Sequence, residues 1–144
     1  MAITFQKNGN LLPGIHIMTI EEFEINYGYN DYRKKLIEGL KIGISHLKDC
    51  GCKKIFIDGS FVTTKEIPGD FDACWDANNV DIPKLKYKYP TIVDFTNGRK
   101  NQKDLYHGEF FPAQEPATPY MLYINFFQKD KNDDPKGIVQ INLN

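Results

Sequence analysis

The feature that most constrains the fold is a short apolar stretch that runs directly into a Gly-Ser pair. Residues 54–58 are predicted to form a buried strand, and Gly59 and Ser60 follow it at once. Both residue types favour turns, so the strand is expected to end in a tight turn. Backbone N–H groups in such a turn can cradle a phosphate, with the Ser60 hydroxyl as a further donor. The alternative is a tight turn without a ligand.

A second apolar segment, about residues 70–75, carries Asp70 and Asp72 with Phe71 between them. Side chains two apart on a strand share a face, so the aspartates should lie side by side with Phe71 in the core. Carboxylates that close repel each other unless a cation or a proton lies between them. We therefore expect Asp70 and Asp72 to bind Mg²⁺ (or Mn²⁺) together with a nucleoside triphosphate. The alternative is a turn aspartate followed by a solvated one.

These motifs resemble a known family. Gly59-Ser60, a spacer and the Asp70–Asp72 pair are similar to the signature of the nucleotidyltransferase fold, which DNA polymerase beta shares with many small nucleotide-transferring enzymes. A closer resemblance is to small uncharacterised bacterial and phage proteins grouped as nucleotidyltransferase-like; it is carried by Leu12-Pro13-Gly14-Ile15-His16, Thr19-Ile20-Glu21-Glu22-Phe23, Asp58-Gly59-Ser60-Phe61-Val62-Thr63 and Pro135-Lys136-Gly137-Ile138-Val139. The resemblance implies an α+β fold over residues 1–144, with a mixed β-sheet flanked by helices.

Phosphoryl chemistry with two metal ions needs a further carboxylate. Glu109 is the first choice because it opens an expected third strand, and Asp94 is the second. The resemblance implies an aspartate at this position, and a glutamate is longer by one methylene, which can shift the ion. Either residue could instead be a surface carboxylate at a strand edge.

Other charged residues near these motifs are weaker candidates. Lys65 and Arg99 could pair with the triphosphate, and the alternative for each is a surface charge. Asp58, before the Gly-Ser turn, and Asp76, at the end of the second strand, could each support a metal ligand or be merely solvated, and we favour solvated.

Composition narrows the classes of partner. The chain has 144 residues, enough for one domain with a substantial core. Its 19 acidic and 18 basic residues give a net charge of −1, so general DNA binding is not expected. It has no membrane-length apolar run, no secretory signal and only three cysteines. A cytoplasmic protein without membrane contact is therefore expected.

Apolar spacing and turn residues predict the remaining elements. A capping box at Thr19 and Glu22 precedes a short helix, and Leu36, Leu40, Ile44 and Leu47 follow helical spacing. Residues 81–101 favour a strand or extended loop over a long helix, and 113–119 a loop. Residues 120–128 slightly favour a helix over a strand. The final strand, 137–143, should turn Val139, Ile141 and Leu143 inward.

Together these features predict transfer of a nucleoside monophosphate from a triphosphate to a hydroxyl of a protein or nucleic-acid acceptor, with release of pyrophosphate. A rival is a binding or regulatory protein that keeps the fold without turnover, such as an antitoxin-like partner of another protein. A third hypothesis is a nucleotide sensor that binds without transfer.

Overall fold

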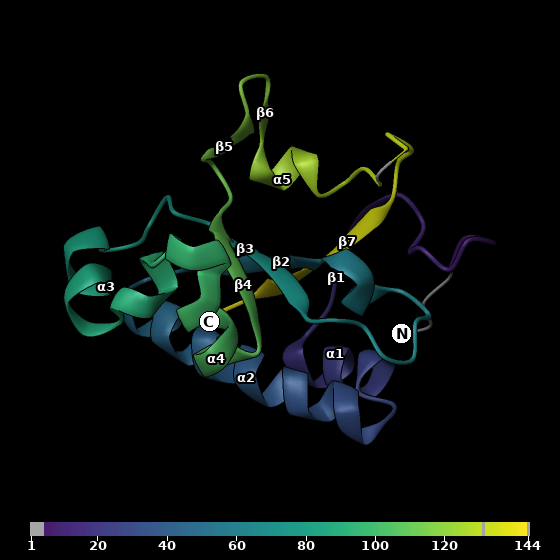
Figure 1. Ribbon diagram of the computed structural model, residues 1–144, viewed down its shortest axis with the longest axis horizontal. Helices are drawn as coiled ribbons and strands as arrows, with labels where there is room; N and C mark the ends of the chain where they lie inside the picture. Colours follow the sequence, from purple (N-terminus) through teal and green to yellow (C-terminus); the bar gives the residue numbers. More distant parts are fainter. Residues whose placement is uncertain (1–4, 131, 144) are drawn as a thin grey trace.

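A five-stranded mixed sheet organises the computed structural model, which describes residues 5–130 and 132–143 (Figure 1). The strand order is β1-β7-β2-β3-β4. The outer pairs β1/β7 and β3/β4 are parallel, and the inner pairs β7/β2 and β2/β3 are antiparallel. The strands are β1 (Gly14–Ile17), β2 (Lys54–Asp58), β3 (Phe71–Trp75), β4 (Gly108–Pro112) and β7 (Gly137–Asn142). The predicted α+β class with a mixed sheet is confirmed.

Helices and a small hairpin lie on opposite faces of this sheet. In Figure 1, α1, α2 and α4 lie below the sheet, whereas the hairpin β5–β6 and the short helix α5 lie above it. The helices are α1 (Ile20–Tyr27), α2 (Asp31–Asp49), α3 (Ile82–Lys88), α4 (Lys100–Tyr106) and α5 (Tyr123–Phe126); the hairpin strands are β5 (Pro116–Thr118) and β6 (Met121–Leu122). Within the described ranges, no helix is long and apolar enough to cross a membrane.

The helical face carries the larger core. The predicted capping box starts α1, since the Thr19 side chain and the Glu22 side chain each accept a backbone N–H of the other residue. The predicted inward face of α2 is confirmed at Leu36, Leu40 and Leu47, all of which are buried. This helix lies close to α4 and to β4 because it carries glycines where a Cβ would meet the backbone of Tyr106 in α4 or the ring of Phe110 in β4.

The strand β7 alternates as predicted. Val139, Ile141 and Leu143 are buried in the core between the sheet and the helices. Gln140 is half-buried and Asn142 is exposed. Because β7 lies between β1 and β2, it connects β1 to the other three strands of the sheet.

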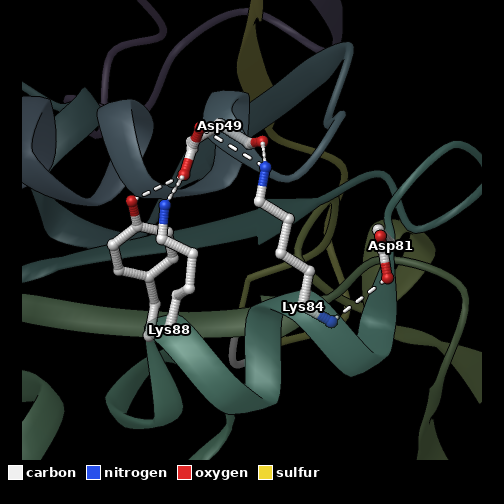
Figure 2. Close-up of polar contacts among 5 residues, drawn as sticks. Asp49, Asp81, Lys84 and Lys88 are labelled. Atoms are coloured by element: carbon white, nitrogen blue, oxygen red, sulfur yellow. Dashed lines mark hydrogen bonds and ion pairs between the residues drawn. The ribbon is translucent and has the colours of Figure 1, made fainter.

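The prediction of a strand or extended loop over residues 81–101 is wrong, since they form α3, two 3₁₀ turns and the start of α4. Asp81 caps α3 by accepting the N–H of Lys84, and Pro83 lies in the first turn, where its missing N–H costs nothing. Figure 2 shows how α3 contacts α2: the carboxylate of Asp49, at the end of α2, accepts from Lys88 Nζ at 2.9 Å and lies 3.5 Å from Lys84 Nζ.

The segment after β4 also differs from its prediction. The loop predicted over 113–119 contains β5, which pairs with β6. The helix slightly favoured over 120–128 is limited to α5, which follows β6 directly. Tyr123, Ile124 and Phe127 pack on a second, smaller apolar cluster on the sheet face opposite the large helices. This segment therefore covers part of the face on which the candidate site lies.

Candidate metal and phosphate site

Three carboxylates form a row across neighbouring strands. Asp72 on β3 lies opposite Asp58 on β2 and opposite Glu109 on β4 in the strand register. Directly paired residues project from the same face of a sheet, so all three side chains share one face. It is the face of Phe56 and Cys74, opposite the large helices.

Asp70 completes a tighter group with two of these residues. One carboxylate oxygen from each of Asp70, Asp72 and Glu109 lies within 4.8 Å of the other two. Phe71, between the aspartates, is buried in the main core, as predicted. The Nζ of Lys103 lies 3.6 Å from Glu109 Oε1 and compensates part of the charge. The structure thus brings together Asp70, Asp72 and Glu109.

The electrostatic environment of the group favours added positive charge. Burial, then the charges of Glu109 and Asp70, raises the pKa of Asp72 to about 7. Burial, then the charge of Glu109, also raises the pKa of Asp70. In the absence of a cation, Asp72 therefore holds a proton for much of the time at neutral pH.

Asp58 and Asp76 are both buried, so the prediction that they are solvated is wrong. Asp76 has partners, because its Oδ1 accepts from the side chain of Gln114 and the backbone of Asn78. Asp58 is 0% exposed, and neither of its oxygens has a hydrogen-bond partner among the described residues. Burial, then the charge of Asp72, raises the pKa of Asp58 well above its usual value. The apolar residues on both faces of β2 are the sequence signal that its last residue is buried too.

The Gly-Ser turn is a single 3₁₀ turn, Gly59–Val62. Gly59 has φ +82°, a conformation that suits glycine, and a Cβ there would lie 2.6 Å from Asp72 Oδ2. The glycine therefore brings the backbone close to the carboxylate group. The hydroxyl of Ser60, predicted to donate to a phosphate, lies outside the described part of the structure.

An open cavity of about 1020 Å³ lies beside the turn. Asp58, Gly59 and Asp72 form part of its wall, as do Lys65, Lys129 and Lys136. Apolar wall comes from β6 and the region of α5, with Met121, Phe126 and Phe127. The cavity thus combines carboxylates, lysines and an apolar side, and it is large enough for a small molecule.

Arg33 holds the backbone of Lys65 in this wall, and the sequence did not indicate this role. The fully buried Arg33 guanidinium donates to the backbone oxygens of Tyr27, Phe61, Thr63 and Lys65. An arginine inside an amphipathic helix usually indicates a surface charge, so only its position on the apolar face of α2, in line with Leu36 and Leu40, signals this role.

Neither Asp94 nor Arg99 belongs to the three-carboxylate group. Asp94 is bonded within its own turn, and Arg99 lies over an aromatic ring. Asp94 accepts from Thr96 and Asn101 in the turn before α4, which lowers its pKa. It is not part of the group that holds Asp70, Asp72 and Glu109. The Arg99 guanidinium lies 4.0 Å from the ring centre of Phe111, the residue two after Glu109, so it reaches the same sheet face.

The donor set suits a hard divalent cation. All the converging ligands are carboxylate oxygens, which Mg²⁺ and Mn²⁺ prefer, and neither histidine nor cysteine joins them among the described residues. A cation there would relieve the repulsion that raises the pKa of Asp72.

The comparisons with known proteins add a family without a known activity. No curated protein and no solved structure matches the chain. Residues 3–142 match a family described as a family of unknown function (DUF6932). Because that match covers nearly the whole chain, the protein belongs to this family.

Proposed function

We propose that the protein is a divalent-cation-dependent nucleotidyltransferase that moves a nucleoside monophosphate from a nucleoside triphosphate to a hydroxyl of a protein or nucleic-acid acceptor. The observation that carries this proposal is the convergence of Asp70, Asp72 and Glu109 next to the positive-φ turn at Gly59. The chain topology around them, strand, Gly-Ser turn, strand with the aspartate pair, then a parallel strand with a third carboxylate, supports the resemblance seen in the sequence.

In this proposal the chain's own residues bind and orient the reactants. Asp70 and Asp72 hold the cation that, when bound, neutralises charge on the phosphates and the leaving pyrophosphate. The backbone at Gly59 approaches the phosphates, and Lys65 and Lys136 lie in the cavity wall within the same region. The acceptor oxygen forms a bond to the α-phosphorus, and the bond from that phosphorus to the pyrophosphate oxygen breaks. Glu109 accepts the hydroxyl proton.

The transfer assay follows from these roles. The protein is incubated with Mg²⁺ and each of the four triphosphates labelled at the α-phosphate, first alone and then with cell extract. Glu109→Gln should abolish transfer and largely spare triphosphate binding, whereas Glu109→Asp should retain or raise the rate. Asp104→Asn is the matched control, because this exposed carboxylate on α4 pairs only with Lys100 among the described residues. The control should transfer label at the wild-type rate.

Triphosphate binding is measured separately by calorimetry. Asp70→Asn combined with Asp72→Asn should abolish Mg²⁺-dependent binding and leave the fold intact. Unchanged affinity in this double variant would refute the cation site.

One observation favours the rival hypothesis of a binding protein without turnover. The Lys103 ammonium lies 3.6 Å from Glu109, where it competes for the carboxylate that should accept the proton. If neither the wild type nor Glu109→Asp transfers label from any of the four triphosphates, the binding hypothesis is the better one. A pull-down from extract should then be lost on changing surface residues and not on changing Glu109.

A further inference from the structure

Arg99 is held in place by aromatic rings, and its charge has no partner within the fold. Its guanidinium carbon lies 4.6 Å from the ring centre of Phe95 and 4.0 Å from that of Phe111. Such contacts use the positive charge and leave the N–H donors available. The Nε is closed off from solvent without a hydrogen-bond partner. Among the described residues, the ion pairs join other side chains and leave Arg99 without a carboxylate.

The backbone that carries Arg99 is unusual as well. Asn97, Gly98 and Arg99 are consecutive and all left-handed, with φ of +51°, +62° and +60°. Glycine adopts this conformation freely, but an arginine is strained in it. The turn places the guanidinium between Phe95, which precedes it, and Phe111 on β4. A strained residue with a fixed and unpaired charge is the kind of outlier that suggests a ligand.

Arg99 lies beside the proposed proton acceptor, on the same face of the sheet. Glu109 and Phe111 are two residues apart on β4, so their side chains share a face. Lys103 lies against Glu109, and Arg99 lies against Phe111. The helix α4 and the turn before it therefore place two cations along this face of β4.

The open cavity beside the Gly-Ser turn lies on the other side of the carboxylates. Its wall includes Asp58 and Asp72 but neither Glu109 nor Arg99. In the proposed function this cavity takes the triphosphate, and Glu109 faces the acceptor hydroxyl. The position of Arg99 is therefore suited to the acceptor.

The surroundings of Arg99 favour a phosphate of a nucleic-acid strand. A guanidinium can donate two parallel N–H bonds to one phosphate. Phe95 is 43% exposed and offers a ring on which a base can stack. Side chains two apart on a strand face are about 7 Å from each other, a span that one nucleotide of an extended strand can bridge from Phe111 to Glu109.

The acidic side chains nearest in sequence have partners of their own. Asp94 accepts from Thr96 and Asn101, and Asp104 pairs with Lys100. These carboxylates are therefore engaged in local contacts, and a phosphate at Arg99 does not have to displace them.

We propose that Arg99 and Phe95 bind the last phosphate of a single-stranded nucleic-acid acceptor, so that its terminal hydroxyl reaches Glu109. The proposal rests on the proposed function for the role of Glu109, and it selects a nucleic acid over a protein as acceptor. It also assigns Arg99 to the acceptor, whereas the sequence suggested the triphosphate.

The binding test uses a fluorescent, unstructured oligouridylate of about ten nucleotides. Its dissociation constant is measured by fluorescence anisotropy at several salt concentrations, without divalent cation or triphosphate. Arg99→Met should weaken binding about tenfold at low salt. The slope of log K against log salt should fall by about 0.7, the value for one lost phosphate contact on a single strand. Arg99→Lys should keep most of the slope and bind with intermediate affinity, because lysine retains the charge without the paired donors.

Lys54→Met is the matched control. The Nζ of Lys54 also lies over a ring, 5.9 Å from the centre of Phe56, but Lys54 is at the opposite end of β2 from Asp58. Removal of this charge should leave both the affinity and the salt slope unchanged. A wild type that does not bind the oligouridylate overturns the proposal even if Arg99→Met does not fold. An unchanged salt slope in folded Arg99→Met, or an equal fall in Lys54→Met, overturns it too.

Transfer of labelled nucleotide to the same oligouridylate separates this proposal from the proposed function. Transfer that falls in Arg99→Met and persists in Lys54→Met supports both. Binding that depends on Arg99 without any transfer supports the phosphate site and counts against the transferase. Transfer only to a protein, or equal transfer by the wild type and Arg99→Met, supports the transferase and overturns this proposal.

Discussion

A Cβ atom on Gly59 would lie 2.6 Å from the Oδ2 of Asp72, closer than real Cβ contacts allow. The backbone of the turn at Gly59 therefore packs directly against the carboxylate of Asp72. The backbone of Gly59 has φ +82°, so any other residue is strained there as well.

Gly59→Ala should therefore lose both stability and cation binding. The strain alone costs about 1 kcal/mol, and the clash displaces the Asp72 carboxylate. Gly98→Ala is the matched control, because Gly98 also has a positive φ but no heavy atom within 4 Å of the new Cβ. We expect the control to lose about 1 kcal/mol in urea unfolding and to keep its Mn²⁺ affinity. Equal Mn²⁺ affinity in both variants would show that the turn does not shape the site.

The raised pKa of Asp72 predicts how the metal-free protein responds to pH. Its pKa is about 7 in the folded state and near 3.8 when exposed, so between these values the folded state binds more protons than the unfolded state. The contribution of Asp72 to stability therefore falls as pH rises from about 4 to about 7. The charged groups that face it from neighbouring elements are Asp58, Asp70, Glu109, Lys103 and Lys136.

This effect is measured as melting temperature against pH in the presence of a chelator. Asp72→Asn should flatten the slope between about pH 5 and pH 7. Mn²⁺ affinity of the wild type should rise over pH 6 to 8, because binding displaces the proton. A slope that is the same in Asp72→Asn would assign the proton to another group.

Arg33→Lys tests how the wall of the cavity is held. Lysine has one charged nitrogen and cannot donate to the backbone oxygens of Phe61, Thr63 and Lys65 at once. Leaving these oxygens without donors should cost about 3 kcal/mol or more in urea unfolding. Lys34→Met, on the next and exposed position of α2, should stay within about 0.5 kcal/mol of the wild type. A loss of similar size in both variants would contradict this role of Arg33.

Gly39→Ala should destabilise the protein although alanine is the better helix former. A Cβ at Gly39 would collide with the backbone oxygen of Tyr106 at the end of α4. A side chain could relieve such a clash by changing its rotamer, but the backbone of α4 cannot. We expect a loss of about 1–3 kcal/mol by thermal unfolding. Ser45→Ala, at an exposed position of the same helix, should be neutral or slightly stabilising. Stabilisation by Gly39→Ala would mean that α4 yields at this contact.

Features that depend on neighbouring residues could be predicted from the sequence. The capping box at Thr19, the inward face of α2 and the burial of Phe71 between two aspartates each follow from periodicity or a local hydrogen bond. The prediction for residues 81–101 was wrong because lysines and apolar residues alternate there as in a strand. Only Leu85 is buried in α3, while Tyr87 is 88% exposed. The alternation therefore does not correspond to the buried and exposed faces of a strand.

The site itself depends on contacts that no local pattern encodes. Glu109 meets Asp72 because β3 and β4 are parallel and α3 and α4 lie between them in the chain. Asp58 is buried on a sheet face that the segment with β6 and α5 partly covers, and that segment was itself predicted poorly. The pairing of strands far apart in sequence is set by tertiary packing, and so the place of Asp58 in the row of carboxylates became visible only in the fold.

The place of β7 between β1 and β2 bears on how the protein is made. β1 pairs with Gly137–Gln140 and β2 pairs with Val139–Asn142, so strands far apart in the sequence must meet before the sheet is continuous. During synthesis on a ribosome, β1 has no sheet neighbour, among the strands described, until Gly137–Gln140 emerge. The nascent chain then exposes strand edges, which are prone to pair with other chains. Completion of the sheet therefore waits for β7, and pairing between strands so far apart in sequence is expected to be slow.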